Sequence, residues 1–398
     1  MCSEKNTLGV HKITKINVIW LWKAGLPLAA HIARKWIEVI WIDIDQKRCD
    51  LINNWGNPIP EEAWLADLLK KHWWKELFAT SDWSETKNWN VFIVIVPLFI
   101  DEHNNPDYSI VDIVSKSIWE HLKKWDTVIF ETTFPPTTTE NRLKNIIEKY
   151  SWLTEWKDFY LAYSPERIMT WVSLSRFEEF PKVIGWVSEI SSNIAYEIYS
   201  QFIPNLNKVK NSKTAEYIKV IEGCYRDSNI ALANELYKIA EELNINFYEA
   251  REFANHQFCN IHTPSTGVGW HCIPVYPHFL IKKMEEANKE SYRTFLNTSR
   301  DVNEDMINYW AEKIILKALE INKPLSKVSI LIKWITYRKW VKELYHSRNH
   351  ALAKLLKSKW VNLFVFDEMY SESEINELWF NYVKSADIEF DCFSLELR

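Results

Sequence analysis

Long apolar runs, a strong net charge and closely spaced cysteines are all missing from this chain of 398 residues. The longest apolar stretch, VFIVIVPLFI at 91–100, is too short to cross a bilayer, and the residues at the N-terminus do not predict a secretory leader. A net charge of −5 indicates neither a nucleic acid nor an anionic membrane as partner. The six cysteines are scattered without framework spacing, so we expect a reducing compartment, the cytoplasm.

Glycine is also scarce, with 7 residues where a typical share of about 7% predicts roughly 28. Tryptophan is abundant instead, with 22 residues. In ARKWIEVI (33–40), KKWDTVIF (123–130) and KSKWVNLF (357–364), tryptophan separates a basic helix end from a strand, where the chain usually needs a left-handed glycine. We hypothesise that many tryptophans are glycines in the living protein, encoded by UGA codons that its source reads as glycine. The alternative is a genuinely tryptophan-rich protein.

The order of apolar segments divides the chain into three parts. From 13 to about 200, apolar strands alternate with helical segments, among them helices expected near 108–123 and 138–149, which predicts an α/β fold with an N-terminal Rossmann-like, doubly wound parallel sheet. Residues 212–256 have apolar positions at helical spacing, and a further helix is expected over 289–320; long helices of this kind often form a homodimer interface. From about 325 the α/β rhythm returns, with a helix expected over 343–357. We expect three domains, 1–205, 206–320 and 321–398, the middle one helical and the last a smaller α/β domain.

The stretch INVIWLWKAGLPLA, residues 16–29, reads as a buried strand, a tight turn and a helix. A dinucleotide-binding turn carries G-x-G-x-x-G there, and glycines at 20 and 22 together with Gly25 would restore that pattern. Asp43 ends the second strand, where a carboxylate accepts hydrogen bonds from the adenosine ribose and favours NAD over NADP. We expect NAD as the cofactor. The alternative is an ordinary strand-to-helix turn with an incidental acid.

A second informative stretch is HTPSTGVGWHCIPVYP, residues 262–277. Gly267 and Gly269 would make a flexible loop that lies against a ligand and presents Cys272, whose thiolate can attack a carbonyl carbon when a nearby cation stabilises it. A lone loop cysteine is more often inert, and zinc binding is a further alternative. The residues of such a zinc site would be His256, Cys259, His262, His271 and Cys272.

Several blocks of sequence carry a resemblance that covers nearly the whole chain. Together with the loop around Cys272, they are similar, in the family's order, to the UDP-sugar 6-dehydrogenases, the family of UDP-glucose and UDP-N-acetylmannosamine dehydrogenases. The resemblance implies that the C6 primary alcohol of a UDP-sugar is oxidised twice, with two NAD, to a uronic acid. The blocks are GLPLA (25–29), ETTFPPTTTE (131–140), YSPERI (163–168), AEYIKVIEGCYRDSNIALANEL (215–236) and ITYRKWVKE (335–343).

The resemblance also implies roles for individual residues. Cys272 would capture the intermediate aldehyde as a thiohemiacetal and then carry a thioester. Lys219 would stabilise negative charge on oxygen, Glu166 would activate water, and Thr133 would lie near both the cofactor and that water. The expected cofactor-binding residues are Trp20, Trp22, Gly25, Asp43, Arg48 and Thr133. The expected substrate-binding residues are Glu166, Arg167, Lys219, Gly267, Gly269, Tyr337 and Arg338.

Two positions depart from the family's pattern. Gly223 stands where the family usually has Asn, and Tyr276 stands where many members have Asp, so the path of proton transfer is open. The segments HCIPVYP and YRKWVKE resemble the branch that oxidises N-acetylated sugars, which favours a UDP-N-acetylhexosamine such as UDP-N-acetylmannosamine. Three alternatives remain: a UDP-glucose dehydrogenase, an inactive paralogue if the tryptophans are literal, and a related dehydrogenase that acts on a small 3-hydroxy acid.

Overall fold

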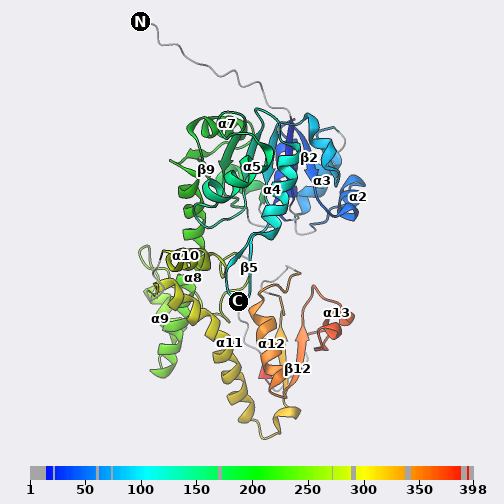
Figure 1. The fold of residues 1–398 in the computed structure, drawn as a ribbon. Coiled ribbons are helices and arrows are strands. Elements are labelled where there is room, and N and C mark those ends of the chain that lie inside the picture. The colour runs from blue at the N-terminus through cyan, green and yellow to red at the C-terminus, as the bar shows by residue number, and fades with distance from the viewer. Residues whose placement is uncertain are drawn as a thin grey trace. The chain divides into compact units, whose positions relative to one another are not determined.

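The computed structural model describes residues 15–20, 23–59, 62–72, 75–168, 173–270, 272–287, 293–336, 342–386 and 392–393. They belong to two compact units, Met1–Val220 and Ile221–Arg398, and the long helix α8 (Ser212–Glu242) contains the boundary (Figure 1). None of the helices in these ranges is both long and apolar enough to cross a membrane. The division into three domains stays a prediction.

The first unit is built around one eight-stranded sheet with the order β10-β9-β8-β7-β4-β1-β2-β3. The six strands from β3 to β8 in that order are parallel, as in a doubly wound nucleotide-binding fold, which confirms the predicted fold class. The strands are β1 (Lys15–Ile19), β2 (Glu38–Ile42), β3 (Leu77–Thr80), β4 (Val91–Val94), β7 (Thr127–Phe130), β8 (Tyr160–Tyr163), β9 (Lys182–Trp186) and β10 (Leu206–Lys208), with a separate hairpin of β5 (Phe99–Ile100) and β6 (Pro106–Asp107).

One edge of this sheet differs from the expected all-parallel arrangement, because β9 pairs with β8 in the antiparallel direction. The connection between these two strands leaves and returns at the same end of the sheet. Arg167, near its start, donates from Nη1 to the carbonyl oxygen of Pro181, near its end, at 2.8 Å. A connection that does not cross the length of the sheet obliges the next strand to run in the opposite direction.

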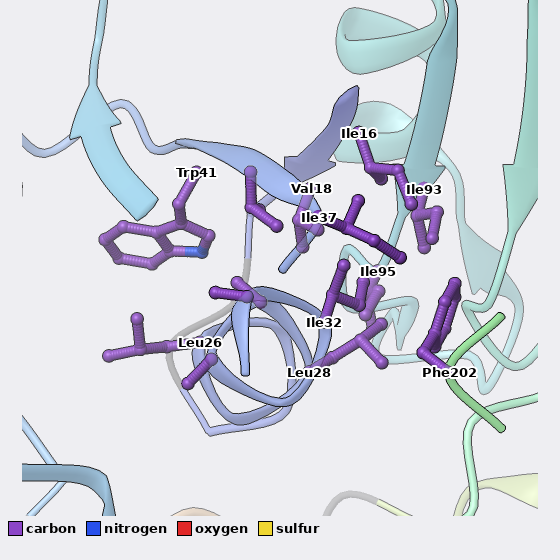
Figure 2. Close-up of a cluster of buried hydrophobic side chains, with 14 of the residues drawn as sticks. Ile16, Val18, Leu26, Leu28, Ile32, Ile37, Trp41, Ile93, Ile95 and Phe202 are labelled. Carbon is purple, nitrogen blue, oxygen red and sulfur yellow. The ribbon is translucent and has the colours of Figure 1, made fainter. Parts of the chain in front are cut away.

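The core of the first unit follows from the apolar character of its strands and of α1. β1 and β4 are nearly continuous apolar runs, as strands that bury both faces require. Figure 2 shows Leu28 and Ile32 of α1 gathered with Val18 and Ile93 of the sheet, and all four are fully buried. Burial of each such side chain contributes about 1.5–3 kcal/mol to stability. Trp41 of β2 lies in the same cluster, and its Nε1 has no hydrogen-bond partner among the described residues.

The helices of the first unit agree with the sequence where the apolar spacing is strong. The helix expected over 108–123 is α4, and the segment expected over 138–149 begins with a π-helical stretch before α5. The prediction missed α2, α3, α6, α7, β3, β9 and β10, since short or half-exposed elements leave a weak periodic signal. The helices are α1 (Gly25–Ala33), α2 (Gln46–Asn53), α3 (Ala63–His72), α4 (Ser109–His121), α5 (Lys144–Ser151), α6 (Ser173–Glu179) and α7 (Glu189–Ser200), with a 3₁₀ turn (Trp83–Asn88) and the π-helix (Thr138–Leu143).

The second unit contains long helices followed by a small parallel sheet with the order β13-β12-β11-β14. The helix expected over 289–320 begins at Phe295, because Thr294 caps it by accepting from the backbone N of Asn297. The helix expected over 343–357 begins only at Arg348, because Ser347 caps it. Beyond α8, the elements are α9 (Phe247–Ala254), α10 (Tyr276–Glu286), α11 (Phe295–Leu319), a 3₁₀ turn (Leu325–Lys327), β11 (Ser329–Lys333), α12 (Arg348–Ser358), β12 (Asn362–Phe366), α13 (Glu372–Glu377), β13 (Asn381–Tyr382) and β14 (Cys392–Phe393).

Candidate active site

The strand order of the first unit reverses between β1 and β4, which lie side by side. From β1 the chain continues to β2 and β3 on one side, and from β4 it continues to β7 and β8 on the other. Ile95 donates from its backbone N to Ile19 O at 3.1 Å, and Trp20 donates to Ile42 O at 2.8 Å. The carboxyl ends of β1, β2 and β4 therefore meet at one edge. Ligands of open α/β sheets bind at such a switch point.

Asp43 lies at this edge, directly after β2, and is 1% exposed. Its Oδ2 accepts from Nη1 of Arg48 at 2.9 Å, and its Oδ1 accepts from the backbone N of Asp45 at 2.9 Å. Arg48 also lies 3.5 Å from the carboxylate of Asp45, so two acids neutralise its charge. A fixed carboxylate with lone pairs to spare suits the hydroxyls of an adenosine ribose, and the engaged arginine offers little to a 2′-phosphate.

The start of α1 fits the pyrophosphate of a dinucleotide, but Trp20 stands where the turn of such a site carries glycine. α1 begins at Gly25, its N-cap Ala24 makes no side-chain hydrogen bond, and its first turn carries no acid. The N-terminus of such a helix binds anions. Trp20, in contrast, has φ of 50° and packs its ring against the apolar cluster of the sheet. Trp22 lies outside the described residues.

A cluster of charges lies where β7 and β8 end. Glu131 follows β7, and its Oε2 is 2.8 Å from Nζ of Lys182 while its Oε1 accepts a hydrogen bond from the hydroxyl of Tyr199. The backbone N of Glu166, after β8, donates to Glu131 O at 3.2 Å. Thr133 also follows β7, so the structure places it at the same edge of the sheet as Glu166. Sequence reasoning missed the roles of Glu131, Lys182 and Tyr199, since nothing in their spacing indicates contact.

Glu166 is the most perturbed acid of this cluster. Burial of its carboxyl group raises the pKa to about 7, and the positive charges of Lys219 and then Lys182 oppose that rise. Its Oε1 is shielded from solvent and has no hydrogen-bond partner in the described part of the chain. A carboxyl group with such a pKa can exchange a proton with water near neutral pH. The structure thus places Glu166 within the field of Lys219, as a shared site requires.

A second buried acid, Glu216, holds the loop that contains Thr133. Its Oε1 accepts from the backbone N of Thr139 at 2.8 Å and from the Thr139 hydroxyl at 2.6 Å, and its Oε2 accepts from the backbone N of Thr137 at 2.6 Å. Burial raises the pKa of Glu216 to about 7, against these hydrogen bonds. Glu216 therefore fixes the start of the π-helix. Sequence reasoning missed it, although a glutamate beside Ala215 and Ile218 in an otherwise buried helical turn was a usable signal.

In the second unit, a network of buried polar groups holds the loop that precedes Cys272. Ser265 donates from N to Oδ1 of Asn234 at 2.8 Å and accepts at O from Nε1 of Trp310 at 2.9 Å. Gly267 has φ of 102°, and a Cβ there would collide with the backbone oxygen of Asn303. Gly267 is thus required by packing, whereas its contact with substrate remains a prediction.

The segment after Cys272 is anchored on α8. Cys272 O accepts from the backbone N of Val275 at 3.1 Å and from that of Tyr276 at 3.0 Å. The ring of Tyr276 lies directly over Gly223, where an added Cβ would come within 3.0 Å of both Cβ and Cγ of the tyrosine. The structure thus brings together the two positions at which the sequence departs from the family's pattern.

Several predicted site residues are placed without being tested. Gly269 is partly exposed in the cysteine loop, and Arg167 is half-buried and bonded to Pro181 O. Tyr337, Arg338 and His271 lie outside the described residues. Within the described ranges, no group of three or more His, Cys, Asp or Glu side chains is arranged to hold a metal ion. Cys272 belongs to the second unit and Lys219 to the first, so their convergence remains a prediction.

A doubly wound sheet with a buried acid at its switch point and a buried acid–base cluster at the same edge is typical of a dinucleotide-dependent oxidoreductase. Residues 14–203 match the NAD binding domain of the UDP-glucose/GDP-mannose dehydrogenase family, and residues 213–305 match the central domain of that family. The chain therefore belongs to the UDP-glucose/GDP-mannose dehydrogenase family, and its cofactor is NAD. The family resemblance and the expected cofactor are both confirmed.

Similar proteins point to one branch of this family. The chain is 34% identical over 372 residues to the UDP-N-acetyl-D-mannosamine dehydrogenase of Methanococcus vannielii, covering 89% of this chain and 80% of the relative. It is 34% identical over 396 residues to that of Methanocaldococcus jannaschii, covering 97% and 86%. The solved structure of UDP-D-ManNAc dehydrogenase from Pyrococcus horikoshii has a TM-score of 0.81 at 30% identity and covers 91% of this chain and 86% of its own.

Proposed function

We propose that this protein oxidises the C6 primary alcohol of a UDP-N-acetylhexosamine, UDP-N-acetylmannosamine above all, to the uronic acid with two NAD. The main support for this substrate is the 34% identity to UDP-N-acetyl-D-mannosamine dehydrogenases over as much as 97% of the chain. The sequence blocks HCIPVYP and YRKWVKE favour the same branch. UDP-glucose is the second candidate substrate.

The proposed reaction has two hydride transfers separated by a covalent step. The alcohol first loses a hydride to NAD and a proton to the protein, which leaves an aldehyde and NADH. The thiolate of Cys272 adds to the aldehyde carbon, and the resulting thiohemiacetal loses a second hydride to a second NAD. Water then attacks the thioester, which releases the carboxylic acid and restores the thiol.

The charge cluster of the first unit supports the roles proposed for Lys219 and Glu166. The fixed positive charge of Lys219 stabilises the oxyanion that forms at each addition step. Glu166 has a pKa of about 7 and a buried Oε1 without a partner among the described residues, and it removes the proton from the attacking water. Thr133 and Asp43 lie at the carboxyl edge of the same sheet, in keeping with contact to the cofactor.

The test is a measurement of NADH released per UDP-sugar by purified protein. The proposal expects two NADH per UDP-N-acetylmannosamine and a kcat/KM at least about tenfold above those for UDP-N-acetylglucosamine, UDP-glucose and GDP-mannose. The Cys272→Ala variant should accumulate or release aldehyde and form at most one NADH. A higher kcat/KM for UDP-glucose would show that UDP-glucose, not UDP-N-acetylmannosamine, is the substrate. Formation of two NADH by Cys272→Ala would show that the reaction does not need the Cys272 thiol.

We also propose a homodimer formed through α8. Its exposed apolar residues recur at intervals of four and seven positions, which places them on one face of the helix. A second copy of the chain would cover this face; sedimentation should give twice the monomer mass, and Leu232→Glu should give monomers. The exposed residues are Ile221, Tyr225, Leu232, Ile239 and Leu243.

The cytoplasm is the proposed location. Cys49 and Cys224 are buried thiols rather than halves of disulfides, which suits a reducing compartment. The cofactor NAD and the proposed UDP-sugar substrate would both be drawn from the cytoplasm. Fractionation of source cells with an antibody to the protein would test the location, and recovery in an extracellular fraction would refute it.

A further inference from the structure

Tryptophan occupies an unusual backbone conformation throughout this molecule. Five of the 22 tryptophans lie outside the described residues, and ten of the other 17 have φ between 50° and 85°. Only a few per cent of non-glycine residues adopt positive φ, and bulky side chains are rare among them. These tryptophans are Trp20, Trp36, Trp55, Trp125, Trp152, Trp156, Trp270, Trp334, Trp360 and Trp379.

The hydrogen bonds around Trp55 show what this conformation does. Trp55 donates from N to Ile52 O at 2.9 Å, and Gly56 donates from N to Leu51 O at 2.8 Å. This pair of bonds is the Schellman motif that ends helices, and its left-handed residue is usually glycine. The backbone at Trp55 therefore ends α2 in the conformation that glycine adopts without strain.

The same motif recurs elsewhere in the chain. Trp379 ends α13 with an equivalent pair of bonds, and Asn244 ends α8 with another. Asparagine tolerates this conformation because its short side chain can bond locally, whereas tryptophan has no such compensation. Trp125 occupies the third position of a turn closed by Asp126 N donating to Lys123 O at 3.2 Å, with φ of 73°. A positive φ at that position is the mark of a type II turn, which requires glycine or asparagine.

Most of the indole rings at these positions are exposed to solvent and contribute little to packing. Trp152, Trp360 and Trp379 are 90%, 84% and 80% exposed, and four others among the ten are more than half exposed. Trp310 is the opposite case: it is 2% exposed, donates from Nε1 to Ser265 O at 2.9 Å and stacks on Tyr237. Positive φ thus separates the ten from Trp310, a tryptophan that the fold packs and bonds. Seven of the ten are also exposed, whereas Trp20, Trp270 and Trp334 are partly buried.

We propose that all ten positions are glycine in the functional protein, and that the structure identifies them individually. Two of them adjoin chemistry. Glycine at 20 would let the turn after β1 approach the pyrophosphate of NAD, and glycine at 270 would free the backbone two residues before Cys272. This inference stands on backbone geometry and does not rest on the substrate proposed above.

The direct test is tandem mass spectrometry of the protein from its native source. The tryptic peptides written INVIWLWK (16–23) and YSWLTEWK (150–157) should carry Trp20→Gly, Trp152→Gly and Trp156→Gly, and DVNEDMINYWAEK (301–313) should keep Trp310. Tryptophan at any of these three positions overturns the assignment there. Glycine at position 310 would show that backbone conformation does not distinguish the positions that carry glycine from those that carry tryptophan.

A recombinant test uses the printed sequence and a variant with all ten Trp→Gly substitutions. We expect the variant to have a Tm at least about 10 °C higher, or to remain in solution where the printed sequence aggregates. The matched control, Trp310→Gly alone, should lower Tm. A lower Tm for the ten-site variant would overturn the proposal. Binding of NAD, followed by calorimetry without any sugar, should be stronger in the variant, whatever the substrate.

A second inference comes independently from the contact between Gly223 and Tyr276. The ring of Tyr276 is 8% exposed and stacks on Phe279, and its position over Gly223 leaves no space for a side chain there. The backbone N of Tyr276 also holds Cys272 O. We infer that Gly223 and Tyr276 are a matched pair that positions Cys272 on α8. The missing side chain at Gly223 makes room for the large ring of Tyr276. A test of this inference through kcat rests on the proposed function.

A double-mutant cycle tests the pair. Gly223→Ala and Tyr276→Ala should each lower kcat at least about tenfold, and Gly223→Ala should cost little further in the Tyr276→Ala background, because the ring is gone and only the tight contact with Cβ of residue 276 remains. Additive losses would refute the matched pair. The rate of Cys272 alkylation by iodoacetamide should show the same non-additivity, and this readout holds even if no UDP-sugar is oxidised.

Discussion

Replacement of Trp152 by glycine should stabilise the protein expressed from the printed sequence. Trp152 ends α5 with φ of 59° and donates from N to Glu148 O at 3.1 Å, a bond that glycine would keep. A left-handed conformation costs a non-glycine residue roughly 1–2 kcal/mol. The ring is 90% exposed, so its removal loses little burial. The greater freedom of glycine in the unfolded chain offsets about 0.5–1 kcal/mol, which leaves a net gain of about 0.75 kcal/mol at the midpoints of these two ranges.

The matched control is Trp119→Gly in the same unit, because the same chemical change should have the opposite sign. Trp119 lies inside α4 and stacks on Tyr150 with ring centroids 5.5 Å apart. Glycine inside a helix costs about 1 kcal/mol, and loss of the packed ring adds about 1–3 kcal/mol.

Scanning calorimetry at constant pH measures both variants. Trp152→Gly should raise the Tm of the first unit by about 1–3 °C, and Trp119→Gly should lower it by several degrees, roughly 4–8 °C. If Trp152→Gly lowers Tm, the indole contributes more than its exposure suggests, and the argument from positive φ fails. If both changes raise Tm, removal of exposed apolar surface rather than backbone strain is the cause.

Three further outcomes follow from other parts of the molecule. Because the carboxyl of Glu166 has a pKa of about 7, the rate of thioester hydrolysis in single-turnover kinetics should rise with pH to a plateau above 7. Lys219→Met removes a positive charge near Glu166 and should move the midpoint of this rise to higher pH; an unmoved midpoint would exclude electrostatic coupling between the two residues. The pKa of Glu216 is raised from 4.5 to about 7 in the folded state, so its contribution to stability is complete below pH 4.5 and is lost as the pH rises through 7; Glu216→Gln should flatten the Tm profile over that window, and an unchanged slope would assign it to other groups. Gly267→Ala should destabilise the second unit by roughly 2–4 kcal/mol in urea titrations, through collision with Asn303 and a strained φ, whereas a loss below 0.5 kcal/mol would mean that the loop moves freely.

The fold was largely predictable because its strongest signals are local. Apolar runs such as VFIV and TVIF are read directly as buried strands, and the order of strands and helices then allows few topologies. The antiparallel β9 was not predicted, because strand direction depends on where the chain from Arg167 to Pro181 returns. The starts of α11 and α12 were predicted too early for a simpler reason. Thr294 and Ser347 cap these helices and so fix where each begins, but the spacing of apolar residues gives no sign of a polar cap.

The candidate site divides in the same way. The places of Asp43 and of the start of α1 in the fold agree with the sequence, since a strand, turn, helix and acid in order require only short segments, and their contact with the cofactor stays a prediction. The cluster of Glu131, Lys182 and Tyr199 was not found, because its members belong to separate elements. Their proximity depends on sheet order rather than on spacing.

By itself, the sequence determined the fold class and the family. Both depend on hydrophobic periodicity and on short motifs in order, which are local features of the chain. Only the tertiary structure decided which acids are buried together, as with Glu216 and Thr139 at 77 positions apart, and which residues leave no room for a side chain, as with Gly223 under Tyr276. Burial and contact between distant segments set pKa values and steric limits, and neither is a property of a residue's neighbours along the chain.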